Sequence, residues 1–176
     1  GGPPSPYAVL VRGSAGRGES LLAADQDNAI VFERGEPGGT EDKWFGALGG
    51  RIAAILDTAG IAYCKGGVMA KNAEWRGSLD FWRERISQWM RRSRPQDLLN
   101  IDIFFDLVPV HGERRLGELL LEDAYAYGHA DAAFPLVLGE RLASLHTPFT
   151  LFGGLRTEEG RIDLKRNALF PLVSAA

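Results

Sequence analysis

The stretch from Tyr7 to Phe32 reads YAVLVRGSAGRGESLLAADQDNAIVF, and it places a glycine-rich turn and two aspartates between two apolar runs. The first run ends at glycines, so we predict a buried strand over residues 7–12 and a turn over 13–19. The second run predicts a strand over residues 28–33, entered directly from the aspartates. The residue types that carry chemistry therefore stand at the ends of two predicted strands.

The glycine-rich turn predicts an anion site. Gly13 and Ser14 follow a strand, and such a turn exposes backbone N–H groups and a hydroxyl at one point, which suits phosphate oxygens. Arg17 lies between two glycines beside this turn. Its fork of N–H donors suits a triphosphate, and an ordinary surface arginine is the alternative interpretation.

The aspartate pair predicts a divalent cation site. Asp25 and Asp27 stand two residues apart at the entry of a strand, which places both carboxylates on one face. Two like charges this close repel unless a cation lies between them, and Mg²⁺ prefers oxygen ligands. An Asp-x-Asp pattern by itself is common in surface loops and is a weak signal. The Gly-Ser turn that precedes it at this spacing makes the prediction of a metal site more specific.

A third carboxylate is expected from residues 100–110, whose apolar run predicts a strand. Asp102 and Asp106 share one face of that predicted strand. A buried aspartate in so apolar a run is costly unless it is paired or coordinated. Either aspartate could complete a two-metal site for phosphoryl transfer. The alternative is that one of them caps a loop or pairs with an arginine.

The remaining pattern predicts helices at 3-to-4 spacing of apolar residues, over residues 40–60, 78–94, 113–127 and 133–145. Thr40 is the predicted cap of the first helix. Three tryptophans, Trp75, Trp82 and Trp89, are expected in the core. Together with the strands, these helices predict an α/β (α+β) fold with a small mixed sheet flanked by helices.

Composition limits the classes of function. The chain has 176 residues, of which 45% are hydrophobic and 24% charged, which suits one domain or one domain and a fragment of a second. The net charge of −3 gives no global basic field for nucleic acid. Its single cysteine, Cys64, predicts a reducing compartment, the cytoplasm, and is interpreted as a small buried hydrophobe. No apolar run approaches the roughly 18 residues that span a membrane.

Five segments carry a resemblance to a known family: Gly13–Glu19, Asp25–Val31, Gly66–Ala70, Trp75–Leu79 and Ile103–Asp106. The Gly-Ser turn, the spacer of ten residues and Asp-x-Asp resemble the nucleotidyltransferase superfamily typified by DNA polymerase β. Taken together, the segments resemble the nucleotidyltransferase family related to the uridylyltransferase of the PII nitrogen-signalling system. This resemblance extends over nearly the whole chain from Pro3 onward, with Val108 where an arginine is frequent and Lys65 where a proline is common.

The resemblance implies a polymerase β-like nucleotidyltransferase fold. It implies a catalytic domain over residues 1–130 and the beginning of a helical C-terminal domain over residues 131–176. The implied metal ligands and catalytic residues are Asp25, Asp27 and Asp106, with Asp102 ranked below Asp106, and the implied nucleotide-binding residues are Gly13, Ser14, Arg17, Gly66 and Gly67. The expected cofactor is Mg²⁺ or Mn²⁺, as two ions.

The implied activity is Mg²⁺-dependent transfer of a nucleoside monophosphate from a nucleoside triphosphate to an acceptor, for which the PII relation suggests a protein side chain. A catalytically silent nucleotide-binding regulatory module is the alternative. A third interpretation is an interaction domain that uses the acidic segment 95–145. Family members usually carry a cyclic-nucleotide-binding domain and a pair of CBS domains, so these are expected in the full-length protein. Neither nucleic acid nor a membrane is an expected partner.

Overall fold

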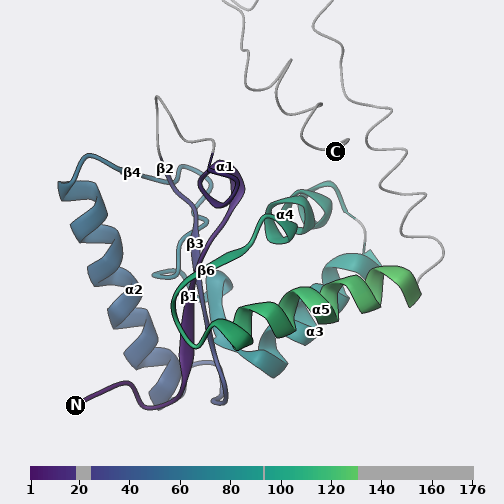
Figure 1. The fold of residues 1–176 in the computed structure, drawn as a ribbon, viewed down its shortest axis with the longest axis horizontal. Helices are drawn as coiled ribbons and strands as arrows, with labels where there is room; N and C mark the ends of the chain where they lie inside the picture. The colour runs from purple at the N-terminus through teal and green to yellow at the C-terminus, as the bar shows by residue number, and fades with distance from the viewer. Residues whose placement is uncertain (19–24, 93, 131–176) are drawn as a thin grey trace, which may run out of the picture. The chain divides into compact units, whose positions relative to one another are not determined.

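A four-stranded mixed sheet forms the centre of the part of the chain that the computed structural model describes, residues 1–18, 25–92 and 94–130. Its order is β5-β3-β1-β6, with β1 over Tyr7–Val11, β3 over Asn28–Phe32, β5 over Arg76–Ser78 and β6 over Val108–Gly112. Strand β1 is antiparallel to β3 and β6, whereas β3 and β5 are parallel (Figure 1). The small mixed sheet and its first two predicted strands are therefore confirmed.

A second, two-stranded sheet lies beside the entry to β3. It pairs β2 (Asp25–Gln26) with β4 (Ala62–Tyr63) in parallel. This short ladder joins the chain that follows the first long helix to the chain that leads into β3. Segments more than 30 residues apart in the sequence thereby meet at one end of the large sheet.

Helix α2 (Thr40–Thr58) covers one face of the sheet (Figure 1). The helix predicted over 40–60 is thus confirmed, although its N-cap residue is Gly39 and Thr40 is the first helical residue. Phe45 is completely buried and stacks on Phe32, with ring centroids 4.7 Å apart. Burial of one such ring contributes about 1.5–3 kcal/mol. The buried residues on this side also include Val9, Ile30 and Ala70.

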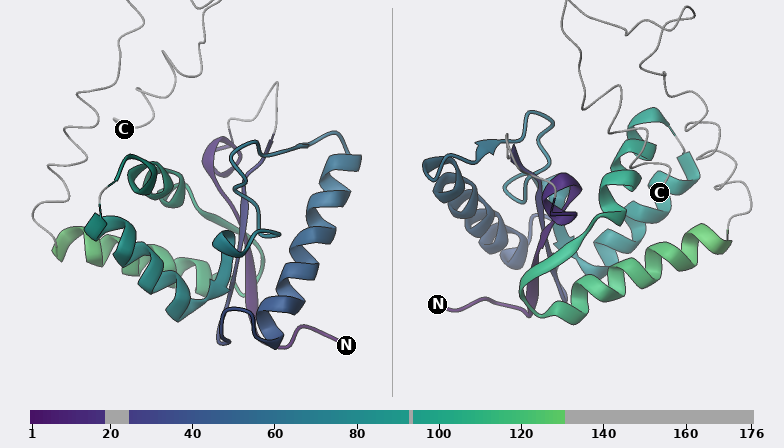
Figure 2. Two further views of the ribbon diagram at one scale, coloured as in Figure 1. Left: turned by 180° about the vertical axis from the view of Figure 1, so that it is seen from behind. Right: turned by 45° about the horizontal axis from the view of Figure 1, so that its top comes forward.

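Helices α3 (Leu79–Arg92), α4 (Pro95–Phe105) and α5 (Arg114–Ala130) lie on the other side of the sheet (Figure 2). Trp82 in α3 is completely buried, and its Nε1–H donates to the carbonyl oxygen of Ile30 at 3.1 Å. Trp75, in the 3-10 helix η1 (Ala73–Trp75), and Trp89 pack against it with ring centroids 6.2 and 6.4 Å away. The predicted core position of the tryptophans and the helices predicted over 78–94 and 113–127 are confirmed.

The prediction of a strand over residues 100–110 is wrong. Residues up to Phe105 belong to α4, and the strand β6 begins only at Val108. Apolar residues at every second position fit the period of a strand, but Ile101 and Phe104 stand three apart and are both 1% exposed, which fits a helix face. A helix start is also signalled by Pro95 in the first turn.

This correction changes the secondary structure in which Asp102 and Asp106 lie, since the sequence pattern predicts both on that strand. Asp102 lies within α4, and Asp106 is the C-cap residue of that helix. Asp106, which the sequence predicts as the third carboxylate, therefore lies at a helix end and not in a strand.

Some expectations lie outside the described residues. They are the helix over 133–145 and the C-terminal domain over 131–176. None of the helices in the described residues is long and apolar enough to cross a membrane.

Candidate functional site

Strand β1 runs into a single helical turn, α1 (Gly13–Gly16), where the sequence predicts a turn. Gly13 has a φ of 59°, and a Cβ there would lie 3.0 Å from Oδ2 of Asp27. A side chain at Gly16 would collide with the carbonyl oxygen of Asp106. The two glycines thus let the turn pack directly against the carboxylate of Asp27 and the backbone of Asp106. Ser14 lies between them in the sequence and is half-buried.

Asp25 and Asp27 alternate with two anchored residues. The side chain of Gln26 donates from Nε2 to two main-chain carbonyl oxygens, one in α2 and one after it, at 3.0 and 2.8 Å. The Oδ1 atom of Asn28 accepts the N–H of Ala70 at 2.9 Å. Neighbouring residues of an extended chain point to opposite sides. Anchoring Gln26 and Asn28 therefore turns both aspartates to the other side, where they are half-buried.

The two aspartates converge, as the sequence predicts, and a cysteine joins them. One ligand atom from each of Asp25, Asp27 and Cys64 lies within 4.8 Å of the other two. The carboxylate pair fits Mg²⁺ or Mn²⁺, because these ions take oxygen ligands and keep positions for water and phosphate oxygens. The residues present therefore fit the metal that the aspartate pattern implies.

Sequence reasoning missed the position of Cys64. The interpretation as a buried hydrophobe is incomplete, because the residue is half-buried and its thiol hydrogen-bonds to the carboxylate of Asp27. Burial and this hydrogen bond raise the pKa of the Cys64 thiol, whereas backbone N–H groups of Val68 and Gly66 act against the rise. No local motif marks the residue, since only the pairing of β2 with β4 brings it to the aspartates.

The segment after Cys64 forms a tight turn through Gly66 and Gly67. Gly67 has a φ of 73°, a backbone conformation that favours glycine. Its N–H donates to the carbonyl oxygen of Cys64 at 3.0 Å, and its carbonyl oxygen accepts Nδ2 of Asn72 at 2.7 Å. A Cβ at Gly66 would lie 3.6 Å from the Cys64 sulfur. The glycines predicted to bind nucleotide therefore shape the turn that positions the thiol.

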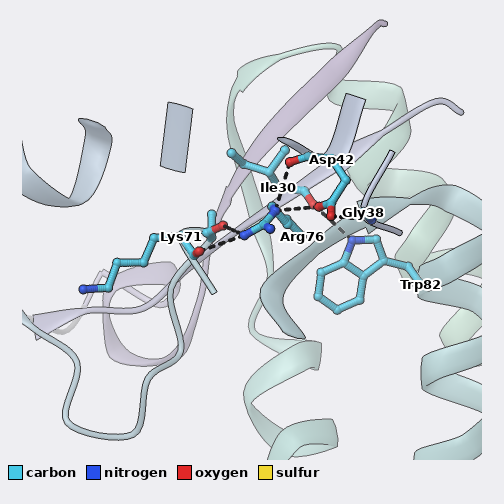
Figure 3. A network of polar contacts seen from close by, with 7 residues as sticks. Ile30, Gly38, Asp42, Lys71, Arg76 and Trp82 are labelled. Carbon is cyan, nitrogen blue, oxygen red and sulfur yellow. Dashed lines mark hydrogen bonds and ion pairs between the residues drawn. The ribbon is translucent and has the colours of Figure 1, made fainter. Parts of the chain in front are cut away.

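Arg76 anchors the end of this turn to α2 (Figure 3). Its Nε donates to Oδ1 of Asp42 at 2.6 Å, and its Nη1 donates to the carbonyl oxygen of Lys71 at 2.7 Å. Asp42 also accepts the N–H of Gly38 at 2.8 Å, close to the start of the helix. This network is remote in sequence from the aspartates, yet it fixes the segment that follows Cys64.

Arg17 and Asp106 meet in an ion pair. Nη1 of Arg17, directly after α1, contacts Oδ2 of Asp106, and the two side chains are 28% and 22% exposed. The structure thus brings together a residue predicted to bind phosphate and a residue predicted to bind metal. Asp106 stands outside the group of ligand atoms that Asp25, Asp27 and Cys64 form.

Arg12, the residue before Gly13, is a second feature that sequence reasoning missed. Its side chain is completely buried and lies over the ring of Trp75, 3.9 Å from the centroid. Within the described residues its three guanidinium nitrogens make no hydrogen bond. Burial lowers the pKa of Arg12 to about 9, while attraction to Asp27, Cys64 and Asp106 opposes the shift, so the group is cationic at neutral pH. The sequence does contain one signal for this buried arginine, which is its position at the end of a predicted buried strand, directly before Gly-Ser.

A mixed sheet with a glycine turn after its first strand and two convergent aspartates before the next is consistent with the nucleotidyltransferase fold that the sequence resemblance implies. Residues 1–96 match the family model described as Putative nucleotidyltransferase DUF294. The chain belongs to this family, and the matched range contains the predicted site residues from Gly13 to Gly67 and ends before Asp106. No curated protein and no solved structure matches the chain.

Proposed function

We propose that the protein transfers a nucleoside monophosphate from a nucleoside triphosphate to an acceptor, with Mg²⁺ or Mn²⁺ held by Asp25 and Asp27. The convergence of these two carboxylates beside the Gly13–Gly16 turn carries the proposal. The family relationship supports general nucleotidyl transfer. Two ions, a uridylyl group and a protein acceptor are the finer parts of the proposal, and they follow the sequence resemblance.

Each residue of the site has a proposed task. Bound divalent ions would neutralise charge on the α-phosphate and on the leaving pyrophosphate. The N–H groups of the Gly13 turn and the hydroxyl of Ser14 would bind phosphate oxygens. Arg17 would exchange Asp106 for the outer phosphates, since its planar fork fits either partner. Asp106, once released, would serve as the third carboxylate.

The proposal has a direct test in the release of pyrophosphate when the protein is incubated with Mg²⁺ and each nucleoside triphosphate in turn. Asp25→Asn and Asp27→Asn should each abolish divalent-dependent nucleotide binding while the fold survives. Neutralising Asp25 relieves its repulsion with Asp27, so Asp25→Asn should melt no lower than the wild type without ligand. Asp27→Asn also loses attraction to the buried Arg12, so a lower melting temperature without ligand is expected for that variant.

Thermal melting with Mg²⁺ and nucleotide measures the loss. In the wild type a nucleotide at a hundred times its Kd should stabilise the fold by about 2.7 kcal/mol. The variants should lose this shift, and Asp57→Asn, at an exposed position of α2, should retain it. A full ligand-induced shift in both site variants would reject the proposed role of the aspartates.

A nucleotide-binding regulatory module is the second candidate. The observation in its favour is the ion pair between Arg17 and Asp106, which engages the third carboxylate away from the aspartate pair. Such a module, joined in a longer protein to CBS and cyclic-nucleotide-binding domains, would bind a nucleotide and transfer nothing. Nucleotide-induced stabilisation without pyrophosphate release from any triphosphate would favour this candidate.

A further inference from the structure

We infer that Cys64 is a metal ligand, so that the site of Asp25 and Asp27 takes a thiophilic divalent ion, such as Zn²⁺ or Co²⁺, in competition with Mg²⁺. This inference rests on the proposed metal site and adds the class of ion that would occupy and block it. It has three supports, which are the positions of the donor atoms, the surroundings of the sulfur and the local charge.

The donor atoms are already close to a coordinating arrangement. Zinc binds sulfur at about 2.3 Å and carboxylate oxygen at about 2.0–2.2 Å, so two ligands of one tetrahedral ion lie roughly 3.6 Å apart. In the protein the three donor atoms lie within 4.8 Å of one another. Side-chain movements of about 1 Å would therefore bring Asp25, Asp27 and Cys64 onto one ion. A water or phosphate oxygen would supply the fourth position.

The sulfur lies between backbone donors and a carboxylate. Backbone N–H groups of Gly66 and Val68 hydrogen-bond to it, while burial and the hydrogen bond with Asp27 outweigh them and raise the pKa of the metal-free thiol. An ion bound between Asp27 and Cys64 would take the place of the thiol proton. As a metal–sulfur bond forms, the S–H bond breaks, its electron pair stays on sulfur and the proton leaves to the buffer. Mg²⁺ does not attract thiolates, whereas Zn²⁺ and Co²⁺ do.

Arg12 supplies an independent indication of the site. Its guanidinium is completely buried, makes no hydrogen bond within the described residues and is attracted to Asp27, to Asp106 and to a thiolate at Cys64. With a thiolate at Cys64, Arg12 and one divalent ion together balance the three negative charges of the ligands. With Mg²⁺ and a neutral thiol, one positive charge remains to attract a triphosphate. A thiophilic ion should therefore weaken nucleotide binding as well as displace Mg²⁺.

Cobalt titration of the reduced full chain tests the inference, because thiolate bound to Co²⁺ gives a charge-transfer absorption in the near ultraviolet. Cys64 is the sole cysteine of the sequence, so such a band can come from no other thiol. We expect the band to saturate at one ion per chain. Cys64→Ser should lack the band and bind Co²⁺ about 10- to 100-fold more weakly, a loss seen even when a metal site loses a supporting group.

A second measurement needs no variant. Alkylation of Cys64 by iodoacetamide should be slowed by stoichiometric Zn²⁺ and not by Mg²⁺. Binding of Co²⁺ without the band, no binding of Co²⁺ at all, or equal alkylation rates with Zn²⁺ and Mg²⁺ would each overturn the inference.

Nucleotide binding by the wild type with Mg²⁺, measured in parallel, separates the two proposals. A cobalt–thiolate band without nucleotide binding would support the inference and reject the proposed function. Nucleotide binding without the band would overturn the inference and leave the proposed function in place.

Discussion

Arg17 directly follows the Gly13–Gly16 turn, where phosphate is proposed to bind, and its side chain is paired with Asp106, the proposed third carboxylate. We expect Arg17→Lys to weaken triphosphate binding about tenfold or more, because an ammonium cannot replace a bidentate fork and a hydrogen bond to a charged group contributes about 1.5–3 kcal/mol. Isothermal titration calorimetry with Mg²⁺ and nucleotide measures the change.

The matched control for this variant is Arg51→Lys, at an exposed position of α2. It should bind the triphosphate with the affinity of the wild type. Equal affinities for the wild type, the control and Arg17→Lys would count against any contact between Arg17 and phosphate.

Contacts at the end of α4 favour Asp106 over Asp102 as the proposed third carboxylate. In an extended chain Asp102 and Asp106 would lie about 13 Å apart, but in a helix four residues rise only about 6 Å. Distance alone therefore does not separate them. Asp106 is the C-cap residue, it contacts Arg17, and its carbonyl oxygen packs against Gly16. These contacts tie Asp106 to the turn where phosphate is proposed to bind.

We accordingly expect Asp106→Ala to remove most metal-dependent nucleotide binding or turnover, and Asp102→Ala to retain most of it. Pyrophosphate release and thermal melting with Mg²⁺ and nucleotide report on both variants. A metal-soaked crystal structure with the ion on Asp102 and remote from Asp106 would reverse the assignment.

Two adjacent glycines of α2 test how that helix holds the turn after Cys64. A Cβ at Gly49 would lie 2.7 Å from the backbone of Ala70, whereas a Cβ at Gly50 would meet nothing within 4 Å. Gly49→Ala should therefore destabilise the fold by about 1–3 kcal/mol through overpacking. Gly50→Ala should stabilise it by about 0.5–1 kcal/mol, because alanine is the better helix former.

Urea unfolding of both variants measures these two opposite changes in the free energy of unfolding. Equal stability changes would show that α2 does not pack closely on the backbone of Ala70. Because Ala70 is hydrogen-bonded to Asn28 at the start of β3, displacement in Gly49→Ala should also weaken metal binding at the aspartates.

Across the whole described molecule, the features that depend on residues close together in the sequence could be predicted. The features that depend on contacts between residues far apart in the sequence could not. The strands over 7–12 and 28–33 could be predicted because each is a short apolar run that is followed by glycine within a few residues. The convergence of Asp25 and Asp27 follows from their spacing. The helix of residues 95–105 was missed, since its apolar residues fit the periods of both a strand and a helix.

The missed members of the site share one physical cause. Cys64 reaches the aspartates through the parallel pairing of β2 with β4, which joins positions more than 30 residues apart. Arg12 is marked as unusual by its complete burial and by its contact with Trp75, and neither can be read from a single sequence. The contact of Asp106 with Arg17 likewise depends on where α4 ends.

The pH dependence of global stability should carry a contribution from Asp97 near the start of α4. Its side chain is 4% exposed and accepts from Nε of Arg94 at 2.6 Å. This hydrogen bond lowers the pKa of Asp97 although burial opposes the shift. The native state therefore binds fewer protons than the unfolded state in the acid range, and stability rises with pH there. The contribution is complete above the ordinary aspartate pKa of about 3.9 and is lost as the pH falls through the lowered native value.

Chemical unfolding of the wild type and Asp97→Asn from pH 6 down to the acid limit of the folded state isolates this contribution, because every other carboxylate titrates in both proteins. The wild type should be the more stable at pH 6, since the variant keeps a weaker neutral hydrogen bond to Arg94. The difference between the two free energies of unfolding should shrink below about pH 4. A difference that stays constant over the whole range would show that the Arg94 contact contributes no charge-dependent stability.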